Sequence, residues 1–309
     1  MTLAIWIGVF LVSLAFLIKA SDYFTESAEK IGIHFGIPAF VVGVTIVSLG
    51  TSLPELASSI VATLKGSSEI VIGNVAGSNI ANILLVLGMA AVIGKHLKVS
   101  WELVHVDLPL LIGSALLLIA TAMDGSFTIY DGLLCLTGYV VYIMYTISAQ
   151  KSKKKKKRKV KLGWKQPVVL VASGAAIYFS ATYTIEAIIK LSGMLNIGKE
   201  IIAVTAVAIG TSLPEMAVSV VAAKKGRSEI AIGNVLGSNI FNTFVVMGIP
   251  SMITTLYVPE SIITFSLPVM LVATLMYFFI TQDKQATRWE GAMLLILYVF
   301  FIGKTFNFF

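Results

Sequence analysis

The sequence lacks most of what a soluble, disulfide-bonded or transition-metal protein needs. Its 309 residues include one cysteine, Cys135, which excludes an intramolecular disulfide, and only three histidines. Charged residues make up 13% of the chain, whereas soluble domains carry about 25%. Hydrophobic residues make up 57%, and the mean hydropathy is +0.91. One aqueous core cannot bury so much apolar surface, so the composition predicts an integral membrane protein.

Long hydrophobic runs are abundant, and their number predicts ten membrane-spanning helices of about 20 residues each. They fall into two groups of five: 3–24, 37–64, 69–93, 104–122 and 126–149, then 166–190, 197–224, 229–253, 259–281 and 287–306. We therefore expect an all-α polytopic fold with a first half at 1–150, a loop at 151–165 and a second half at 166–309. Gly and Pro inside 37–64 and 197–224 predict broken or kinked helices there.

Basic residues are concentrated between the two halves. Nine of the eleven residues from Lys151 to Lys161 are Lys or Arg. Because cytoplasmic loops are rich in Lys and Arg, this loop is predicted to be cytoplasmic, which places both chain ends outside the cell (plasma) membrane. The basic run is interpreted as a topology determinant, with binding to anionic lipid as the alternative. The apolar character of the remaining chain excludes a nucleic-acid-binding domain.

Residues 50–88 and 210–248 are two copies of one motif. Twenty-six of the 39 aligned positions are identical, with a constant offset of 160. The shared residues include Gly, Thr, Ser, Pro, Glu and Asn, which the packing of apolar helices does not require. Five spans per half is an odd number, so the copies cross the membrane in opposite directions. Such inverted repeats usually place a substrate site near the midplane at their interface.

Each copy carries one carboxylate inside an apolar span, Glu55 in the first and Glu215 in the second. A carboxylate at the bilayer centre costs at least about 2.5 kcal/mol, so it is expected to face a cavity or a partner. Neither span places a Lys or Arg near its carboxylate. Buried structural carboxyl groups are the alternative. The repetition of the same costly residue in identical surroundings favours a cation site.

Other oxygen-bearing groups accompany the first carboxylate. Thr51 lies four residues before Glu55, on the same helix face, and Ser52 lies on the adjoining face. Pro54 has no N–H, so the carbonyl of Gly50 loses its helical partner. The second copy repeats this arrangement. The set is an all-oxygen environment, which suits a hard cation.

The next span of each copy adds a serine and an asparagine four residues apart: Ser78 with Asn82, and Ser238 with Asn242. Two carboxylates with these amides and hydroxyls provide the six to eight oxygens that Ca²⁺ takes. No Cys or His occurs in the motifs, which argues against Zn²⁺ or Cu²⁺. Hydrogen bonding between helices is the alternative role for these serines and asparagines.

GTSLPE followed by GN-x-x-GSNI-x-N in both halves resembles the α-repeats of the Na⁺/Ca²⁺ exchanger family, within the cation/Ca²⁺ antiporter superfamily, and in particular its compact prokaryotic members. The resemblance implies a secondary active antiporter, not an enzyme, with no cofactor. It would exchange Na⁺ for Ca²⁺ by alternating access, with the first and sixth spans moving. H⁺-coupled exchange of Ca²⁺ or another divalent cation, and a cation channel, remain alternatives.

The resemblance also implies a role for each motif position. Glu55 and Glu215 would be central carboxylates shared among the ions, and Thr51 and Thr211 would bind Ca²⁺ through their carbonyls. The remaining ligands would be Ser52 with Ser78 at one Na⁺ site, Ser212 with Ser238 at another, the carbonyls of Ser48 and Ala208 at further Na⁺ positions, and Asn82 with Asn242 in the middle. At position 242 several family members have Asp, so Asn here removes a third carboxylate and disfavours K⁺ coupling.

Overall fold

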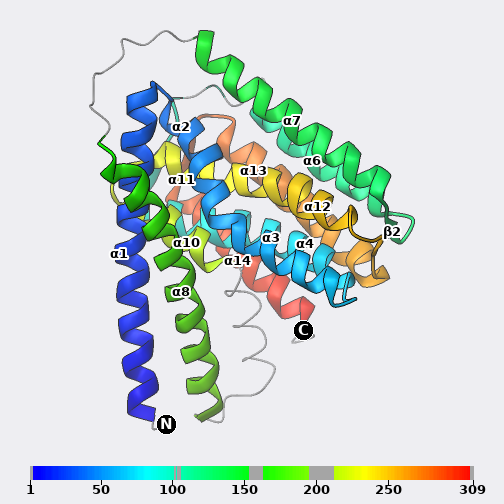
Figure 1. Cartoon of the computed structure of the whole chain (residues 1–309), viewed down its shortest axis with the longest axis horizontal. Coiled ribbons are helices and arrows are strands. Elements are labelled where there is room, and N and C mark those ends of the chain that lie inside the picture. Colours follow the sequence, from blue (N-terminus) through cyan, green and yellow to red (C-terminus); the bar gives the residue numbers. More distant parts are fainter. Residues whose placement is uncertain (1–2, 101, 103–105, 153–162, 195–211, 307–309) are drawn as a thin grey trace.

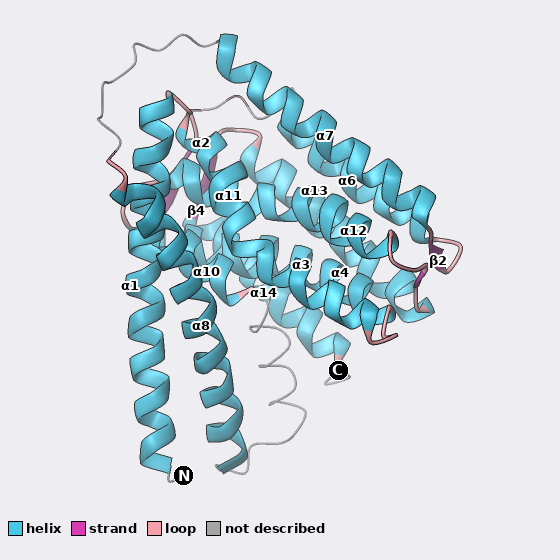
Figure 2. Ribbon diagram, viewed as in Figure 1, coloured by secondary structure: helices cyan, strands magenta, loops and turns pink. Residues whose placement is uncertain are grey.

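A computed structural model describes residues 3–100, 102, 106–152, 163–194 and 212–306, and the predicted all-α polytopic class is confirmed (Figures 1 and 2). The first half contains α1 Leu3–Phe35, α2 Ala39–Val42, η1 Gly43–Val47, α3 Ser48–Leu64, α4 Glu69–Ala81, η2 Asn82–Leu87, α5 Gly88–Gly94, α6 Asp107–Ala122 and α7 Ile129–Ser152. The second half contains α8 Lys165–Met194, α10 Leu213–Lys224, α11 Ser228–Phe241, η3 Asn242–Val246, α12 Met247–Ser251, η4 Ile262–Ser266, α13 Leu267–Thr281 and α14 Arg288–Thr305.

The helical stretches coincide with the ten predicted spans. Within the described residues, seven are long and apolar enough to cross a membrane, and α6 is a shorter apolar helix. Span seven is described only from Ser212 onward, with α10 beginning at Leu213, and the predicted loop falls mostly on 153–162, which lies outside the described residues.

Helix α1 is longer than its predicted span, which ended at residue 24. It contains 33 residues, about 50 Å of helix, against a hydrocarbon thickness of about 30 Å. The apolar run ends near Asp22, but the helix continues because its charged residues have partners: Lys225 pairs with Asp22, and Arg227 Nε lies 2.7 Å from Glu29 Oε2. Gly36, at φ 72°, then ends the helix in a left-handed turn.

Helices α1 and α8 lie side by side and cross the other helices obliquely (Figure 1). The hydroxyl of Thr184 on α8 donates to that of Ser13 on α1 over 2.9 Å. Farther along the pair, Phe24 of α1 fills the space over two glycines: a Cβ at Gly50 would lie 2.5 Å from its ring, and one at Gly174 3.4 Å. Phe24 is thus one direct contact between the α1–α8 pair and the motif of the first half.

The irregularity predicted for span two is a π-helical segment within a continuous helix. Residues 39–64 are helical throughout, with Pro54 inside α3 and a π-helical segment, η1, before it. Similar π-helical segments follow Ala81 and Phe241 in spans three and eight. A π-helix shifts the hydrogen-bond ladder by one residue, so the distortion is spread over a turn and the helix does not break.

Two short antiparallel ladders extend the internal symmetry beyond the repeated motif. Strand β1, His96–Lys98, pairs with β4, Gln285–Thr287, and β2, Ser126–Phe127, pairs with β3, Leu256–Tyr257. An offset of 160 places β1 on β3 and β2 on β4. Each ladder joins a strand of the first half to a strand of the second. The repeat operation converts the β1–β4 pair into the β3–β2 pair, so the two ladders are equivalent. This is the pattern of two inverted, interlocked repeats.

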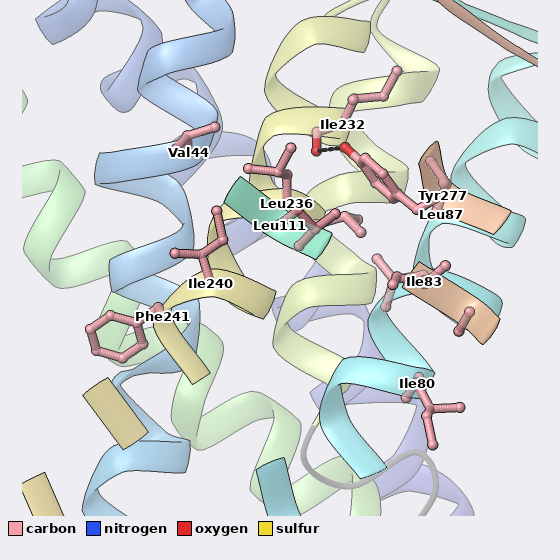
Figure 3. Packing of buried hydrophobic residues seen from close by; sticks show 14 of the residues in the cluster. Val44, Ile80, Ile83, Leu87, Leu111, Ile232, Leu236, Ile240, Phe241 and Tyr277 are labelled. Atoms are coloured by element: carbon pink, nitrogen blue, oxygen red, sulfur yellow. Dashed lines mark hydrogen bonds between the residues drawn. The ribbon is translucent and has the colours of Figure 1, made fainter. Parts of the chain in front are cut away.

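The core is centred on α11, in which every residue from Ile230 to Phe241 is buried. Ile232, Leu236 and Ile240 point from α11 into the hydrophobic cluster, and the hydroxyl of Tyr277 donates to the carbonyl of Ile232 over 3.0 Å (Figure 3). A Cβ at Gly233 would lie 2.5 Å from the carbonyl oxygen of Phe40, so the backbones of α11 and α2 touch there. The part of the second motif that lies on α11 is thus packed directly against the backbone of the first half.

Candidate functional site

The structure brings the two motif carboxylates together between the halves. Glu55 lies inside α3 and Glu215 in the first turn of α10, and their exposed fractions are 2% and 1%. The hydroxyl of Ser52 donates to Glu215 Oε1 over 3.0 Å, which joins the first copy of the motif to the second. The ion pairs found among the described residues involve neither carboxylate.

Several buried polar atoms at this site have no hydrogen-bond partner in the described part of the chain. They are Glu55 Oε2, Glu215 Oε2, Ser212 Oγ, Ser238 Oγ, and the side-chain oxygen and nitrogen of Asn82 and Asn242. A buried polar group without a partner costs about 1–3 kcal/mol, and more if it is charged. Such groups are rare in native proteins, and here they gather on the repeated motifs. Their oxygens are suited to hold a cation.

The donor set fits a hard cation better than a transition metal. No cluster of three or more His, Cys, Asp or Glu residues that could hold a metal occurs in the described ranges. Two carboxylates with amide and hydroxyl oxygens match the ligand preference of Ca²⁺. Two negative charges also balance one divalent ion.

The two copies of the motif differ in local structure. In the first half α3 runs through the motif, and Pro54 leaves the Gly50 carbonyl without an N–H from four residues ahead. In the second half α10 begins at Leu213, one residue after Ser212, whose hydroxyl makes no capping bond although serine is a favoured N-cap residue. The hydroxyl is therefore available to another ligand. Glu215 lies at the positive end of the α10 dipole.

The serine and asparagine of the next span lie where the helix changes type. Asn82 begins η2 and Asn242 begins η3, and the N–H of each bonds to carbonyls three and four residues earlier. Ser78 and Ser238 are 2% and 0% exposed. π-Helical segments are frequent at functional sites because they redirect side chains. The sequence placed these residues on one face of a plain α-helix and missed the π-helical segments.

Two assigned positions lie outside the described residues, Thr211 and Ala208. Ser48 opens α3 and is buried, with its hydroxyl donating to the Val44 carbonyl. Thr51 is also buried, at 1% exposure. The described members of the predicted set are therefore all buried, at 2% exposure or less.

Sequence reasoning missed four further asparagines of the motif. Asn79 and Asn239, at equivalent positions, bond reciprocally: each side-chain amide donates to the other's backbone carbonyl, over 3.4 and 3.2 Å. Asn74 and Asn234 bond to hydroxyl groups around the carboxylates. The sequence did mark these positions, because each asparagine recurs at the equivalent position of the other copy. Residue type alone, however, cannot tell an asparagine that binds an ion from one that holds a neighbouring residue in place.

A cavity of about 330 Å³ reaches the first carboxylate from one side. Its lining includes Glu55, Ser58 and Val61 of α3, Tyr178 of α8, and Pro214 of α10. Glu215 is not part of the lining, and its Oε1 accepts from Ser52. This cavity therefore gives access to Glu55 but not to Glu215.

Comparison with known proteins agrees with this geometry. Residues 5–148 and 165–306 match the family described as sodium/calcium exchanger protein. The chain is 34% identical to the sodium/calcium exchanger MaX1 of Methanosarcina acetivorans, over 96% of this chain and 97% of that protein. It is 31% identical to the putative antiporter CaxA of Alkalimonas amylolytica, over 94% and 95%.

Among solved structures, one of the sodium-calcium exchanger NCX_Mj soaked with Na⁺ and Sr²⁺ superposes with a TM-score of 0.84 at 29% identity, covering 98% of this chain and 99% of that one. The family match covers both halves, and these full-length likenesses include ones above 30% identity. The chain belongs to the sodium/calcium exchanger protein family.

Proposed function

We propose that this protein is a secondary active antiporter that exchanges Na⁺ for Ca²⁺ across the cell membrane by alternating access. The observation that carries the proposal is the pair of buried carboxylates, Glu55 and Glu215, which meet at the junction of two inverted repeats among polar atoms without partners. The family and the likeness to MaX1 and NCX_Mj support Na⁺ and Ca²⁺ as the transported ions. The protein is a transporter without a resident cofactor.

The two cations would compete for the same oxygens. Glu55 and Glu215 balance one Ca²⁺, and the carbonyls of Thr51 and Thr211 complete its inner contacts. For Na⁺ we assign Ser52 with Ser78 on one flank and Ser212 with Ser238 on the other, with the carbonyls of Ser48 and Ala208 as further ligands. Asn82 and Asn242 line the middle. Because position 242 has no charge, an ion there would depend on neutral oxygens.

Alternating access would move α1 and α8 against the motif helices. Phe24 links α1 to Gly50, so displacement of the α1–α8 pair would act directly on the residue that precedes Thr51. In the assigned orientation the loop after α3 lies outside, because it has one basic residue, Lys65, whereas the end of α10 and the loop after it have three, Lys224, Lys225 and Arg227. The cavity at Glu55 would then open to the outside.

The same orientation places both chain ends outside and the loop at 151–165 in the cytoplasm. That loop divides the first half, 1–150, from the second, 166–309. Its Lys and Arg residues would act mainly as the topology signal, with attraction to anionic lipid as a second effect.

The test is Ca²⁺ uptake by proteoliposomes containing the purified protein. A Na⁺ gradient imposed at fixed pH is expected to drive uptake, and a pH gradient without Na⁺ is expected to drive none. Uptake with the pH gradient alone would instead indicate H⁺-coupled exchange. Ca²⁺ flux that needs no counter-ion and follows voltage alone would indicate a channel.

A further inference from the structure

Two asparagines that are not part of the assigned ligand set make the same contact in both halves. Asn74 Nδ2 donates to Ser59 Oγ over 3.2 Å, and Asn234 Nδ2 donates to Ser219 Oγ over 2.9 Å. Each serine lies four residues after a motif carboxylate, on the same helix face. The contact fixes the rotation of the amide, because its nitrogen is held at the serine and its oxygen must point elsewhere.

The oxygen of each amide points at a residue assigned to the ions. Asn234 Oδ1 accepts from the hydroxyl of Thr51 over 3.3 Å, across the junction of the halves. Asn74 Oδ1 accepts from the hydroxyl of Ser78 over 3.5 Å. The Thr51 hydroxyl also lies 3.3 Å from the carbonyls of Val47 and Ser48, within its own half. Asn234 therefore contacts the Thr51 hydroxyl from the second half.

At Thr51 the assigned ligand is the carbonyl, and the bond from its hydroxyl to Asn234 holds the residue in place. At Ser78 the hydroxyl itself is the assigned ligand, and a hydroxyl has one proton. An oxygen that offers its lone pairs to a positive ion must direct that proton to an acceptor on the other side. An amide oxygen accepts the proton without adding a charge to the site. Outer groups of this kind orient metal ligands, and their loss typically weakens metal binding 10- to 100-fold.

We propose that Asn74 and Asn234 are positioning residues of the ion site. Each is anchored by a serine one turn beyond a motif carboxylate; the Asn74 oxygen orients the hydroxyl ligand of Ser78, and the Asn234 oxygen holds the side chain of Thr51, whose carbonyl is the assigned Ca²⁺ ligand. This inference rests on the proposed function. Asn234 is the stronger case because it is fully buried and its contact joins the two halves.

The experiment compares three variants in Na⁺-driven Ca²⁺ uptake, with KM and maximal rate measured separately. Asn234→Leu keeps the approximate size but has no acceptor, and Asn234→Asp keeps an acceptor oxygen. Tyr277→Phe is the matched control, because it also removes one buried hydrogen bond, to the carbonyl of Ile232, and that bond involves no assigned ligand. All are compared at equal amounts of protein that elutes as a single folded species.

Asn234→Leu is expected to raise the KM for Ca²⁺ about tenfold. In Asn234→Asp the KM for Ca²⁺ is expected to be at or below the wild-type value. In Tyr277→Phe the KM is expected to lie within about threefold of the wild-type value. A wild-type KM in Asn234→Leu, or equal impairment of the Leu and Asp variants, would overturn the proposal. If Asn234→Leu does not fold, Ser219→Ala replaces it: a raised KM supports the inference and an unchanged KM overturns it. Wild-type protein without Na⁺-driven uptake would refute the proposed function itself.

Discussion

Glu215→Gln is the substitution that probes the charge balance of the site most sharply. Glutamine keeps the shape of the side chain, and its carbonyl oxygen can still accept the hydrogen bond from Ser52 that Glu215 Oε1 accepts over 3.0 Å. What the substitution removes is one of two negative charges in a site where the carboxylates are at most 2% exposed. Ca²⁺ bound between Glu55 and this neutral amide would therefore leave one positive charge uncompensated.

The size of the effect follows from this burial. Removing one partner of a buried ion pair costs about 3–5 kcal/mol, and each 1.4 kcal/mol is about a factor of ten in affinity. Glu215→Gln is therefore expected to weaken Ca²⁺ binding at least about 100-fold. Glu55→Gln should do the same, because the two residues are equivalent members of the inverted repeats and both carry an oxygen without a partner in the described part of the chain.

The assay is equilibrium Ca²⁺ binding to the purified protein in detergent, supported by uptake into proteoliposomes. Glu69→Gln is the control, because Glu69 is exposed at the start of α4 and its neutralisation should leave binding unchanged. Glu215→Gln protein that is folded and binds Ca²⁺ within about threefold of wild type would refute the reasoning.

Three further predictions concern the ligands, the packing and the orientation. Ser52→Ala removes a hydrogen bond to a charged group, worth about 1.5–3 kcal/mol, and should raise the half-saturating Na⁺ concentration about tenfold in uptake assays; an unchanged value contradicts the assigned role. Gly233→Ala forces a Cβ to 2.5 Å from a backbone oxygen and should destabilise the protein by about 1–3 kcal/mol in thermal unfolding, whereas Gly8→Ala, which meets nothing within 4 Å, should not. Ser67→Cys should react with an impermeant maleimide added outside cells and Lys224→Cys only after permeabilisation; the reverse pattern would invert the orientation.

Much of the architecture could be predicted from the sequence because lipid imposes simple rules. Hydrophobic length predicted ten spans, and the copies at 50–88 and 210–248 predicted two inverted halves, an arrangement that the solved structure of NCX_Mj matches. The ladders that join the halves could not be predicted, because strands of two or three residues carry no periodicity. The length of α1 was underestimated because the charged residues Asp22 and Glu29 indicate the end of a membrane span in the sequence. Their ion-pair partners, Lys225 and Arg227, are distant in the sequence and could not be predicted.

The carboxylates of the site could be predicted from the sequence, whereas the roles of its asparagines could not. The cost of charge in a membrane singles out Glu55 and Glu215 without any structure. The same argument is weaker for asparagine, which serves both as ligand and as helix-to-helix contact. Asn242 and Asn239 are three residues apart and both identical in the two copies, yet within the described chain one has no side-chain partner and the other bonds across the halves. Only three-dimensional contacts separate these roles.

The central claim is that a single divalent cation sits between Glu55 and Glu215 on protein oxygens. Crystals of the protein soaked in Sr²⁺, an electron-rich divalent cation, would test it through anomalous-difference density. The account predicts one strong peak within coordination distance of both carboxylates, lost when Na⁺ is raised. A peak bound to one carboxylate alone, or density only elsewhere in the protein, would contradict it.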